Sequence, residues 1–182
     1  MTNFPVHTIE TAPAGARPAL ENLQANFGMI PNILGSMSTS PVLINSLVGL
    51  FGQVHGGSFT EAQIQTLLLT NAVTNESAWA VAFHTALALK EGLDAADVQA
   101  IRERRLPQDE KLARLSALAQ SLILKRGHLD QQDIQAFLAA GFEKGHALEV
   151  IAVVAASTIT NYTGSVTQTP LEAAFQPYAW TK

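Results

Sequence analysis

Signals that begin and end helices recur along the whole chain, and no segment alternates apolar and polar residues with the period of two that a half-buried strand requires. Ser40 and Pro41 place an N-cap before proline at the first helical position, and Thr60 with Gln63 forms a capping box. With Asn75 as a further N-cap, these signals predict an all-α fold. The expected helices cover residues 17–27, 41–54, 61–73, 76–91, 95–104, 107–123, 131–140 and 146–166.

No stretch of the sequence is suited to separate two domains. The most polar joints, residues 101–108 and 125–129, are too short to act as linkers. A chain of 182 residues has the length of one domain and can bury a core without disulfides or metals. We therefore expect an N-terminal extension over residues 1–14 and a single helical domain over residues 15–182.

Charged residues are scarce in the first half of the chain. Between Asn22 and Leu89 the only charged side chains are Glu61 and Glu76. Charged residues make up 14% of the whole chain, against about 25% in typical soluble domains. A surface rich in Ser, Thr, Asn and Gln would account for this pattern, but we favour burial against other copies of the chain, and so predict a homo-oligomer.

The remaining composition restricts location and partners. Residues 1–14 have neither a basic segment nor an apolar segment of a signal peptide, so a cytoplasmic location is expected. Residues 150–171 are uncharged, but they hold threonines, Asn161 and Pro170, so no membrane span is expected. The net charge of −4 at pH 7 argues against nucleic acid as a partner.

The absence of cysteine excludes disulfides, thiolate metal sites and a thiol nucleophile. His55 is the histidine best placed for a metal, beside Gly56-Gly57, but no second ligand lies at metal-binding spacing. No motif indicates a flavin, nicotinamide or haem, so neither a metal nor another cofactor is expected.

The most informative segment is QTLLLTNAVTNESAWAVAFHT, residues 65–85. It resembles the core motif of the AhpD-like/carboxymuconolactone decarboxylase family, whose text around two cysteines typically reads Asn-Gly-Cys-x-Tyr-Cys-Val-x-x-His-Thr. Here the asparagine, an aromatic residue, the valine, the histidine and the threonine are in register. Residues 27–47 and 161–170 resemble the lead-in helices and the C-terminal segment of the peroxidase-related branch, so the likeness covers most of the chain.

The positions that differ from the family are the chemical ones. Ser77 and Ala80 stand where the family has its two cysteines, and Gln65 stands where it has a glutamate. In a family member, a thiolate at the helix start would be oxidised by peroxide and resolved by the second cysteine, with the histidine relaying a proton. His84 remains, but without a thiol this peroxidase mechanism is impossible.

The candidate site therefore consists of the motif positions. Ser77, Ala80 and His84 share one face of a helix, with His84 as a possible proton relay or a core histidine with one hydrogen bond. Ser77 is about 10 Å from His84 along the helix axis, too far for direct activation, so it is expected to be a polar wall rather than a nucleophile. Trp79 is expected in the core or at an interface, with a pocket wall as the alternative, and Gln65 is expected to line the same site.

Two kinds of function follow from these residues. The first is a pseudo-enzyme that binds a small apolar or weakly polar ligand, classed as peroxidase-related by similarity alone. The alternative is a thiol-independent lyase like the decarboxylase branch, with His84 as acid or base, although no Arg or Lys lies between Arg17 and Lys90 to hold a carboxylate. The resemblance also implies a trimer or a hexamer built from trimers.

Overall fold

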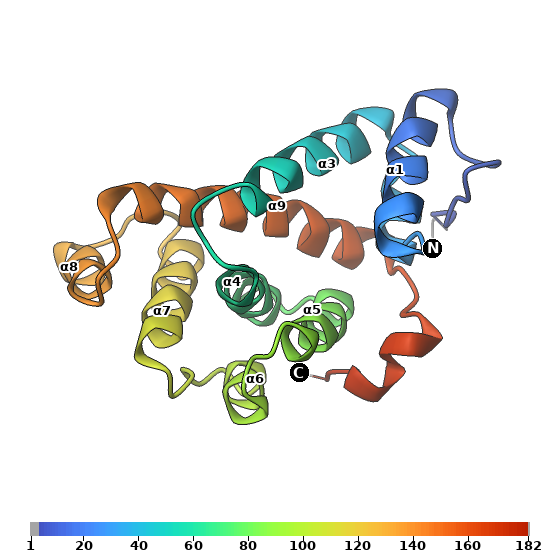
Figure 1. Ribbon diagram of the computed structural model, residues 1–182. Coiled ribbons are helices and arrows are strands. Elements are labelled where there is room, and N and C mark those ends of the chain that lie inside the picture. Colours follow the sequence, from blue (N-terminus) through green and yellow to red (C-terminus); the bar gives the residue numbers. More distant parts are fainter. Residues whose placement is uncertain (1–3, 182) are drawn as a thin grey trace.

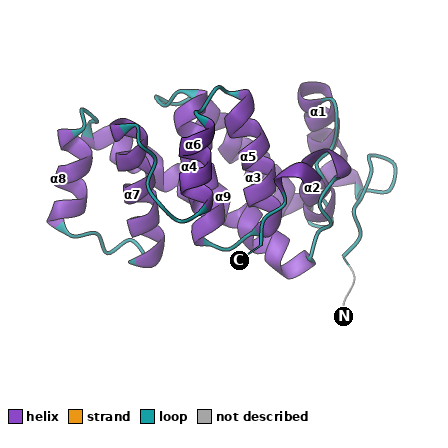
Figure 2. Ribbon diagram, turned by 90° about the horizontal axis from the view of Figure 1, so that it is seen from below, coloured by secondary structure: helices purple, strands orange, loops and turns teal. Residues whose placement is uncertain are grey.

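Helix α4 (Glu61–Thr74) is the centre of the molecule. Every residue from Ile64 to Val73 is buried, including the polar residues among them, because neighbours cover the helix on all sides. A helix that is buried all round must be enclosed by others. In the computed structural model, which describes residues 4–181, the enclosing helices are α5 (Ala78–Lys90), α6 (Ala95–Arg102), α7 (Glu110–Leu124) and α9 (Lys144–Thr167) (Figures 1 and 2).

Helix α9 runs across the molecule between α4 and α3 (Pro41–His55) (Figure 1). By length and composition α9 could cross a membrane. However, it packs against several helices of the bundle and buries Ser157, Thr160 and Asn161, which suits the core helix of a folded domain. The expectation that the protein does not enter a membrane stays a prediction.

The N-terminal part of the chain packs over α3 and the end of α9. It contains η1 (Ala14–Ala16), α1 (Arg17–Phe27) and the short α2 (Asn32–Met37). Residues 4–13 contain no helix, and their backbone lies against α2, where the His7 amide donates to the carbonyl of Gly35 at 3.2 Å. A Cβ on Gly35 would come within 2.8 Å of the His7 carbonyl oxygen, so this close approach requires glycine.

Two apolar clusters fill the interior, and α4 contributes to both. One lies among α1, α2, α3, α5 and α6. The other lies among the end of α3 and helices α7, α8 (Gln131–Ala139) and α9, with Phe137 and Phe142 stacked at 4.4 Å between ring centroids. Because one helix belongs to both clusters, the described residues fold as a single all-α domain, as expected.

The segment between α4 and α5 corrects one sequence expectation. Asn75 does not cap a helix over residues 76–91; it is the C-cap of α4, and Ser77 is the N-cap position of α5. Glu76 has φ 56°, while the amides of Glu76 and Ser77 donate to the carbonyls of Val73 and Ala72. This is a Schellman turn, usually made with glycine, and a glutamate in its left-handed position hides the signal.

Other helix boundaries differ by a few residues. The helix expected from Pro107 begins at Glu110, because the Asp109 side chain accepts from the Leu112 amide and so sets the N-cap there. Helix α9 begins at Lys144 rather than His146, since Glu143 occupies the N-cap. After α9 the chain forms the 3-10 helix η2 (Ala173–Tyr178), which packs against α5.

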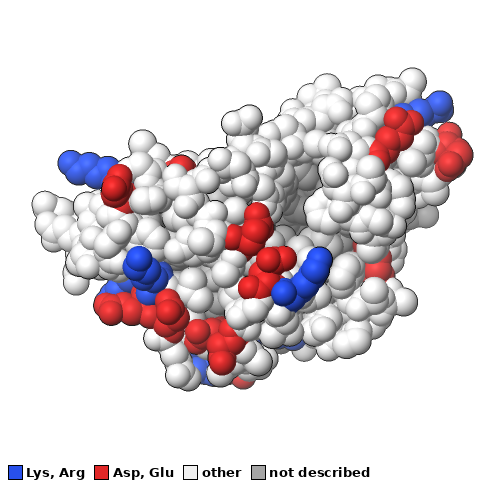
Figure 3. All heavy atoms as spheres, in the orientation of Figure 1, with Lys and Arg blue, Asp and Glu red and all other residues white. Residues whose placement is uncertain are grey.

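Charged side chains are unevenly spread over the surface. Figure 3 shows a face over α3 without charges, whereas acidic and basic groups gather along the edge formed by α6 and α7. Helix α3 has no Asp, Glu, Lys or Arg, in line with the low charge of the first half of the sequence. An uncharged helix face at the surface is compatible with contact between copies of the chain, but the oligomeric state stays a prediction.

Candidate functional site

The inward face of α5 brings the motif positions together. Ser77, Ala80 and His84 are 4%, 0% and 4% exposed, because this face is pressed against α4 and α9. The Schellman turn allows α5 to start immediately beside the end of α4. The register expected from the sequence therefore places all three residues in the interior rather than in an open cleft.

His84 and Gln65 meet between α5 and α4. Nδ1 of His84 lies 3.1 Å from Oε1 of Gln65, and both residues are buried. With the Gln65 oxygen accepting, Nδ1 carries the hydrogen, and Nε2 of His84 presents a lone pair. Within the described residues, Nε2 makes no hydrogen bond. The pair expected from the motif therefore exists, but the carboxamide replaces the carboxylate that could exchange a proton.

Burial keeps the His84 imidazole uncharged. Desolvation, and to a smaller degree the charge of His55, lower its pKa from 6.5 to about 3. At neutral pH it has no proton to donate as a general acid, and it is a weak base. A role as proton relay is therefore poorly supported, whereas a neutral hydrogen-bonding role is well supported.

Glu61, one turn before Gln65 on α4, is the charged residue at the edge of the site. Glu61 is four residues before Gln65, and its carboxylate lies 2.9 Å from Nδ1 of His55. The side chains of His55 and Glu61 are 37% and 46% exposed. His55 is thus engaged by one carboxylate at the surface, and the described residues contain no group of three or more His, Cys, Asp or Glu that could hold a metal.

Ser77 occupies the start of α5 but does not cap it. Its side chain accepts no hydrogen bond from the first turn of the helix, and its hydroxyl has no partner among the described residues. A Cβ built on Gly164 of α9 would lie 3.5 Å from Oγ of Ser77. The hydroxyl therefore faces α9, and no base reaches it to make it a nucleophile.

The outer side of α5 is covered by the C-terminal segment, residues 169–181. The Trp79 indole is stacked on Phe83 at 4.9 Å, and Phe175 of η2 meets Phe83 edge-on at 5.1 Å. Oε2 of Glu172 accepts from the Trp79 Nε1–H at 2.9 Å, and Oε1 accepts from the Asn32 amide at 2.6 Å. Trp79, at 7% exposure, is a core aromatic in this fold.

The end of the same segment is held by Arg102. Its guanidinium donates to the carbonyls of Tyr178 and Ala179 and to the hydroxyl of Thr85, while its own carbonyl accepts from the Trp180 indole. Sequence reasoning missed this C-terminal strap. The one available signal was that Glu172 is the first charged residue after Glu149.

Neither of the two best-formed surface hollows is lined by the motif residues. A hollow of about 480 Å³ lies between α6 and the strap, with Arg102, Arg104 and Trp180 on its walls. Another of about 320 Å³ lies between α7 and α8, beside Lys125 and Asp133. A ligand that contacts His84 or Ser77 must therefore enter a region that is closed in this structure.

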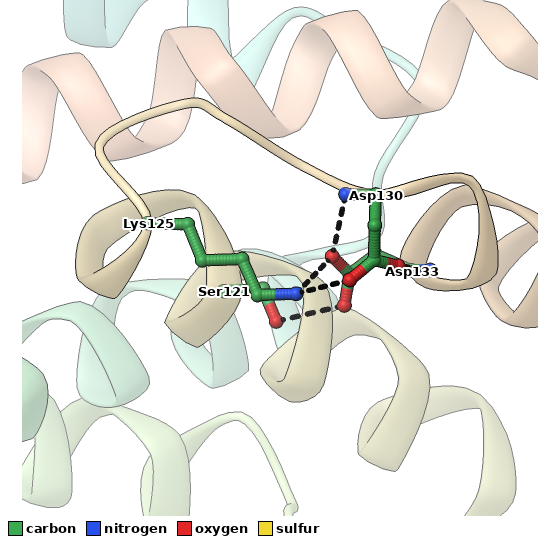
Figure 4. A network of polar contacts seen from close by, with 4 residues as sticks. All are labelled: Ser121, Lys125, Asp130 and Asp133. Carbon is green, nitrogen blue, oxygen red and sulfur yellow. Dashed lines mark hydrogen bonds and ion pairs between the residues drawn. The ribbon is translucent and has the colours of Figure 1, made fainter.

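The polar network beside the second hollow fastens α8 to α7 (Figure 4). Nζ of Lys125 lies 2.8 Å from Asp130 and 2.5 Å from Asp133, and the Ser121 hydroxyl donates to Asp133. The bonds from Lys125 lower the pKa of both carboxyls. Because the ammonium is shared by two carboxylates and their remaining bonds are internal, the network serves structure and offers no free charge to a ligand.

No protein-family model matches the sequence, and a comparison with curated proteins finds no match. Among solved structures, a peroxidase-related protein with an AhpD core from Ralstonia eutropha JMP134 has a TM-score of 0.84 at 14% identity, covering 95% of this chain and 93% of its own. The debrominase Bmp8, as a cysteine-to-alanine variant in complex with 2,3,4-tribromopyrrole, has a TM-score of 0.81 at 18% identity, covering 98% and 96%. A peroxidase-related protein from Silicibacter sp. TM1040 has a TM-score of 0.77 at 16% identity, covering 96% and 92%.

These likenesses establish the fold. The chain has the all-α AhpD-like architecture over almost its whole length, as the motif at residues 65–85 predicted. It has no cysteine at Ser77, at Ala80 or anywhere else. The identities are too low to carry an activity from those proteins to this one.

The depressed pKa of His84 predicts a pH-dependent stability. Between pH 6.5 and about 3 the unfolded chain binds a proton that folded His84 rejects, so the free energy of unfolding should fall as pH falls through this window. The slope should be roughly 1 kcal/mol per pH unit. Urea unfolding from about pH 8 down to about pH 5 should show a shallower slope for His84→Gln than for wild type. His128→Gln, which removes an exposed histidine, is the control; equal slopes for wild type and His84→Gln would contradict the assignment.

The hydrogen bonds of Glu172 predict that it holds the strap closed. Glu172→Ala removes two bonds to a carboxylate, each worth about 1.5–3 kcal/mol, so local opening of residues 169–181 should become easier. Hydrogen exchange of this segment should quicken by roughly tenfold or more, while α4 exchanges at its former rate. Gln176→Ala, which loses one bond to Leu171, serves as the control. Unchanged exchange in the Glu172 variant would contradict the prediction and show that the contacts of Phe175 and Arg102 are enough to hold the strap closed.

Proposed function

We propose that the protein is a thiol-free relative of the AhpD-like peroxidases by fold, which does not reduce peroxides and instead binds a small neutral ligand at the inward face of α5. The observation that carries this proposal is the motif geometry. Ser77, Ala80 and His84 remain together and buried, and His84 is bonded to Gln65, yet none of them can carry electrons.

The chemistry of the side chains argues against peroxide reduction. The family reaction requires a thiolate that becomes a sulfenic acid and a second thiol that resolves it. The chain has no cysteine, and neither the Ser77 alcohol nor the Ala80 methyl group can replace one. The uncapped start of α5 would stabilise a thiolate, but the side chain at that position is the Ser77 hydroxyl, which stays protonated.

The electrostatics of the site favour a neutral ligand. His84 is uncharged at neutral pH, Gln65 is an amide, and Glu61 of α4, which contacts His55 of α3, is at the surface. A charged ligand in this interior would lose hydration without gaining a counter-ion. Among the structural relatives, Bmp8 holds a substituted pyrrole, which is a small neutral molecule.

The alternative, a thiol-independent lyase acting through His84, has less support. Decarboxylation of a lactone acid needs a proton donor or acceptor and a group that holds the carboxylate. The pKa of His84, about 3, makes it ineffective in acid–base exchange. Arg102 is the cation that bonds to a motif residue, because its guanidinium donates to the Thr85 hydroxyl. Its other guanidinium hydrogen bonds go to carbonyls of the C-terminal strap, so they are not available to a substrate carboxylate.

We further propose that the protein is a homo-oligomer, with a trimer or a hexamer as the favoured sizes. Helix α9 presents exposed apolar side chains at roughly heptad spacing, with no charge between Glu149 and Glu172. The exposed residues are Leu148 at 69%, Ile151 at 48%, Tyr162 at 61% and Val166 at 67%. An uncharged stripe of this kind suits a second copy of the same chain. A cytoplasmic location and the lack of nucleic-acid partners stay predictions.

Peroxide consumption tests the proposed loss of redox chemistry. With a dithiol reductant supplied, wild type should remain at the rate of the protein-free reaction, because no thiolate can form. A variant carrying Gln65→Glu, Ser77→Cys and Ala80→Cys should consume peroxide at least roughly tenfold faster, since two thiols then stand one helical turn apart at an uncapped helix start. The variant with Gln65→Glu and Ser77→Cys, in which Ala80 is kept, is the matched control without a resolving thiol. Turnover by wild type would refute the proposal.

The molecular mass in solution tests the proposed assembly. Light scattering after gel filtration should show wild type as a multiple of the 19.4 kDa chain. Ile151→Glu combined with Tyr162→Glu should shift the mass toward one chain, because two buried carboxylates would face each other across the interface. Leu124→Glu, which alters an equally exposed apolar residue at the end of α7, should leave the mass unchanged. A monomeric wild type would exclude the interface.

A further inference from the structure

Two asparagines in the interior have amide atoms without partners. Asn71 of α4 is 0% exposed and Asn161 of α9 is 1% exposed. Within the described residues, Oδ1 and Nδ2 of Asn71 and Oδ1 of Asn161 form no hydrogen bond. The only side-chain bond of the pair runs from Nδ2 of Asn161 to the Ser157 hydroxyl at 3.3 Å. One amide is thus wholly unpaired and the other half paired.

Such atoms are unusual inside a folded protein. Nearly all buried polar groups form hydrogen bonds, and each one left unpaired destabilises the fold. Other polar groups of this interior are paired, such as Thr70 with Ser116 and Nδ1 of His84 with Gln65. The three amide atoms are fully enclosed and unpaired within the described residues, so they call for a partner that is not part of the chain.

Each asparagine lies within three residues of a position that contacts Ser77. On α9, Gly164 follows Asn161 by three residues on the same face, and a Cβ on Gly164 would lie 3.5 Å from Oγ of Ser77. The Ser77 amide is bonded at 2.9 Å to the carbonyl of Ala72, the residue next to Asn71. The start of α5 therefore lies beside both α4 and α9, near each asparagine.

Helical spacing directs Asn71 toward α9. It follows Leu67 and Leu68 by four and three residues, so the three share one stripe of α4. Both leucines belong to the apolar cluster that contains Val153 and Ala156 of α9. Asn71 continues this stripe toward the end of α4, where the cluster gives way to polar residues.

The unpaired atoms define what would satisfy them. Oδ1 of Asn71 and Oδ1 of Asn161 accept, so the partner must donate to both; Nδ2 of Asn71 donates, so the partner must also accept. The uncapped first turn of α5 and the Ser77 hydroxyl add donors for the accepting atom. A planar group with an N–H side and a carbonyl oxygen meets this demand. A carboxylate does not, since it cannot donate and no cation faces it.

We propose that Asn71, Ser77 and Asn161 form a buried polar site between α4, α5 and α9 that binds the carboxamide, lactam or urea end of a small neutral ligand. This inference rests on the proposed function, because it names the ligand class of the same inward face of α5.

Nuclear magnetic resonance of the full chain tests the site with acetamide as the probe and acetate as the charged molecule of equal shape. Acetamide should shift the side-chain amide signals of Asn71 and Asn161 saturably in the millimolar range, and acetate should not. Asn161→Leu and Asn71→Leu should each weaken the response of the remaining asparagine by at least roughly tenfold, because the ligand loses one of its partners. Ser116→Ala removes an internally paired buried hydroxyl and should leave the affinity unchanged.

The wild-type titration decides the question even if a leucine variant fails to fold. No saturable shift with acetamide, or equal shifts with acetate, would overturn the inference. Pyrrole separates this result from the proposed function. If pyrrole shifts the His84 ring and Trp79 indole signals while acetamide leaves the signals of both asparagines unchanged, the protein has a ligand site, but not one for carboxamide, lactam or urea groups. If neither probe shifts any of these signals, both proposals fall.

Discussion

The complete enclosure of α4 is the constraint on which the rest of the structure depends. A helix with ten consecutive buried residues can exist only if others cover every side of it, and α5, α6, α7 and α9 supply those sides. The polar side chains of α4 must then form their hydrogen bonds inside the protein. Gln65 is bonded to His84 and Thr70 to Ser116, but the side-chain amide of Asn71 has no partner among the described residues. The hydrogen bonds in the interior therefore depend largely on α4, because its central residues have no solvent-exposed face.

The same enclosure determines what chemistry the motif can support. Pressing α5 onto α4 removes water from His84, and the loss of hydration lowers its pKa to about 3. In a site with a thiolate or a carboxylate nearby, an adjacent negative charge would favour the protonated ring. Here Gln65 and Ser77 are neutral, so nothing offsets desolvation. With neutral residues at positions 65, 77 and 80, the His84 imidazole is uncharged at neutral pH.

Sequence reasoning predicted the parts of this structure that depend on local signals. Capping boxes and proline positions located α3 and α4, and the spacing of Ser77, Ala80 and His84 placed them on one helix face, which the structure buries. The start of α5 was misplaced because Glu76, not glycine, takes the left-handed position of the turn. Local sequence patterns could not predict whether the site is open. The segment that covers α5 is held by Glu172, which bonds to Trp79 although more than ninety residues separate the two in the chain. The short helix α2 was also missed, since no side chain caps it.

The unpaired asparagines bear on whether this fold is an idle scaffold. If the interior served packing alone, leucine at positions 71 and 161 would bury similar volume without unpaired amide atoms, and the fold would be more stable. Proteins tolerate such losses of stability chiefly where binding or catalysis requires them. A chain that had merely lost its cysteines would be under no constraint to keep polar atoms beside the vacated positions. Each asparagine lies within three residues of a position that contacts Ser77, which stands at a cysteine position of the motif, and this supports the proposal that the interior binds a ligand.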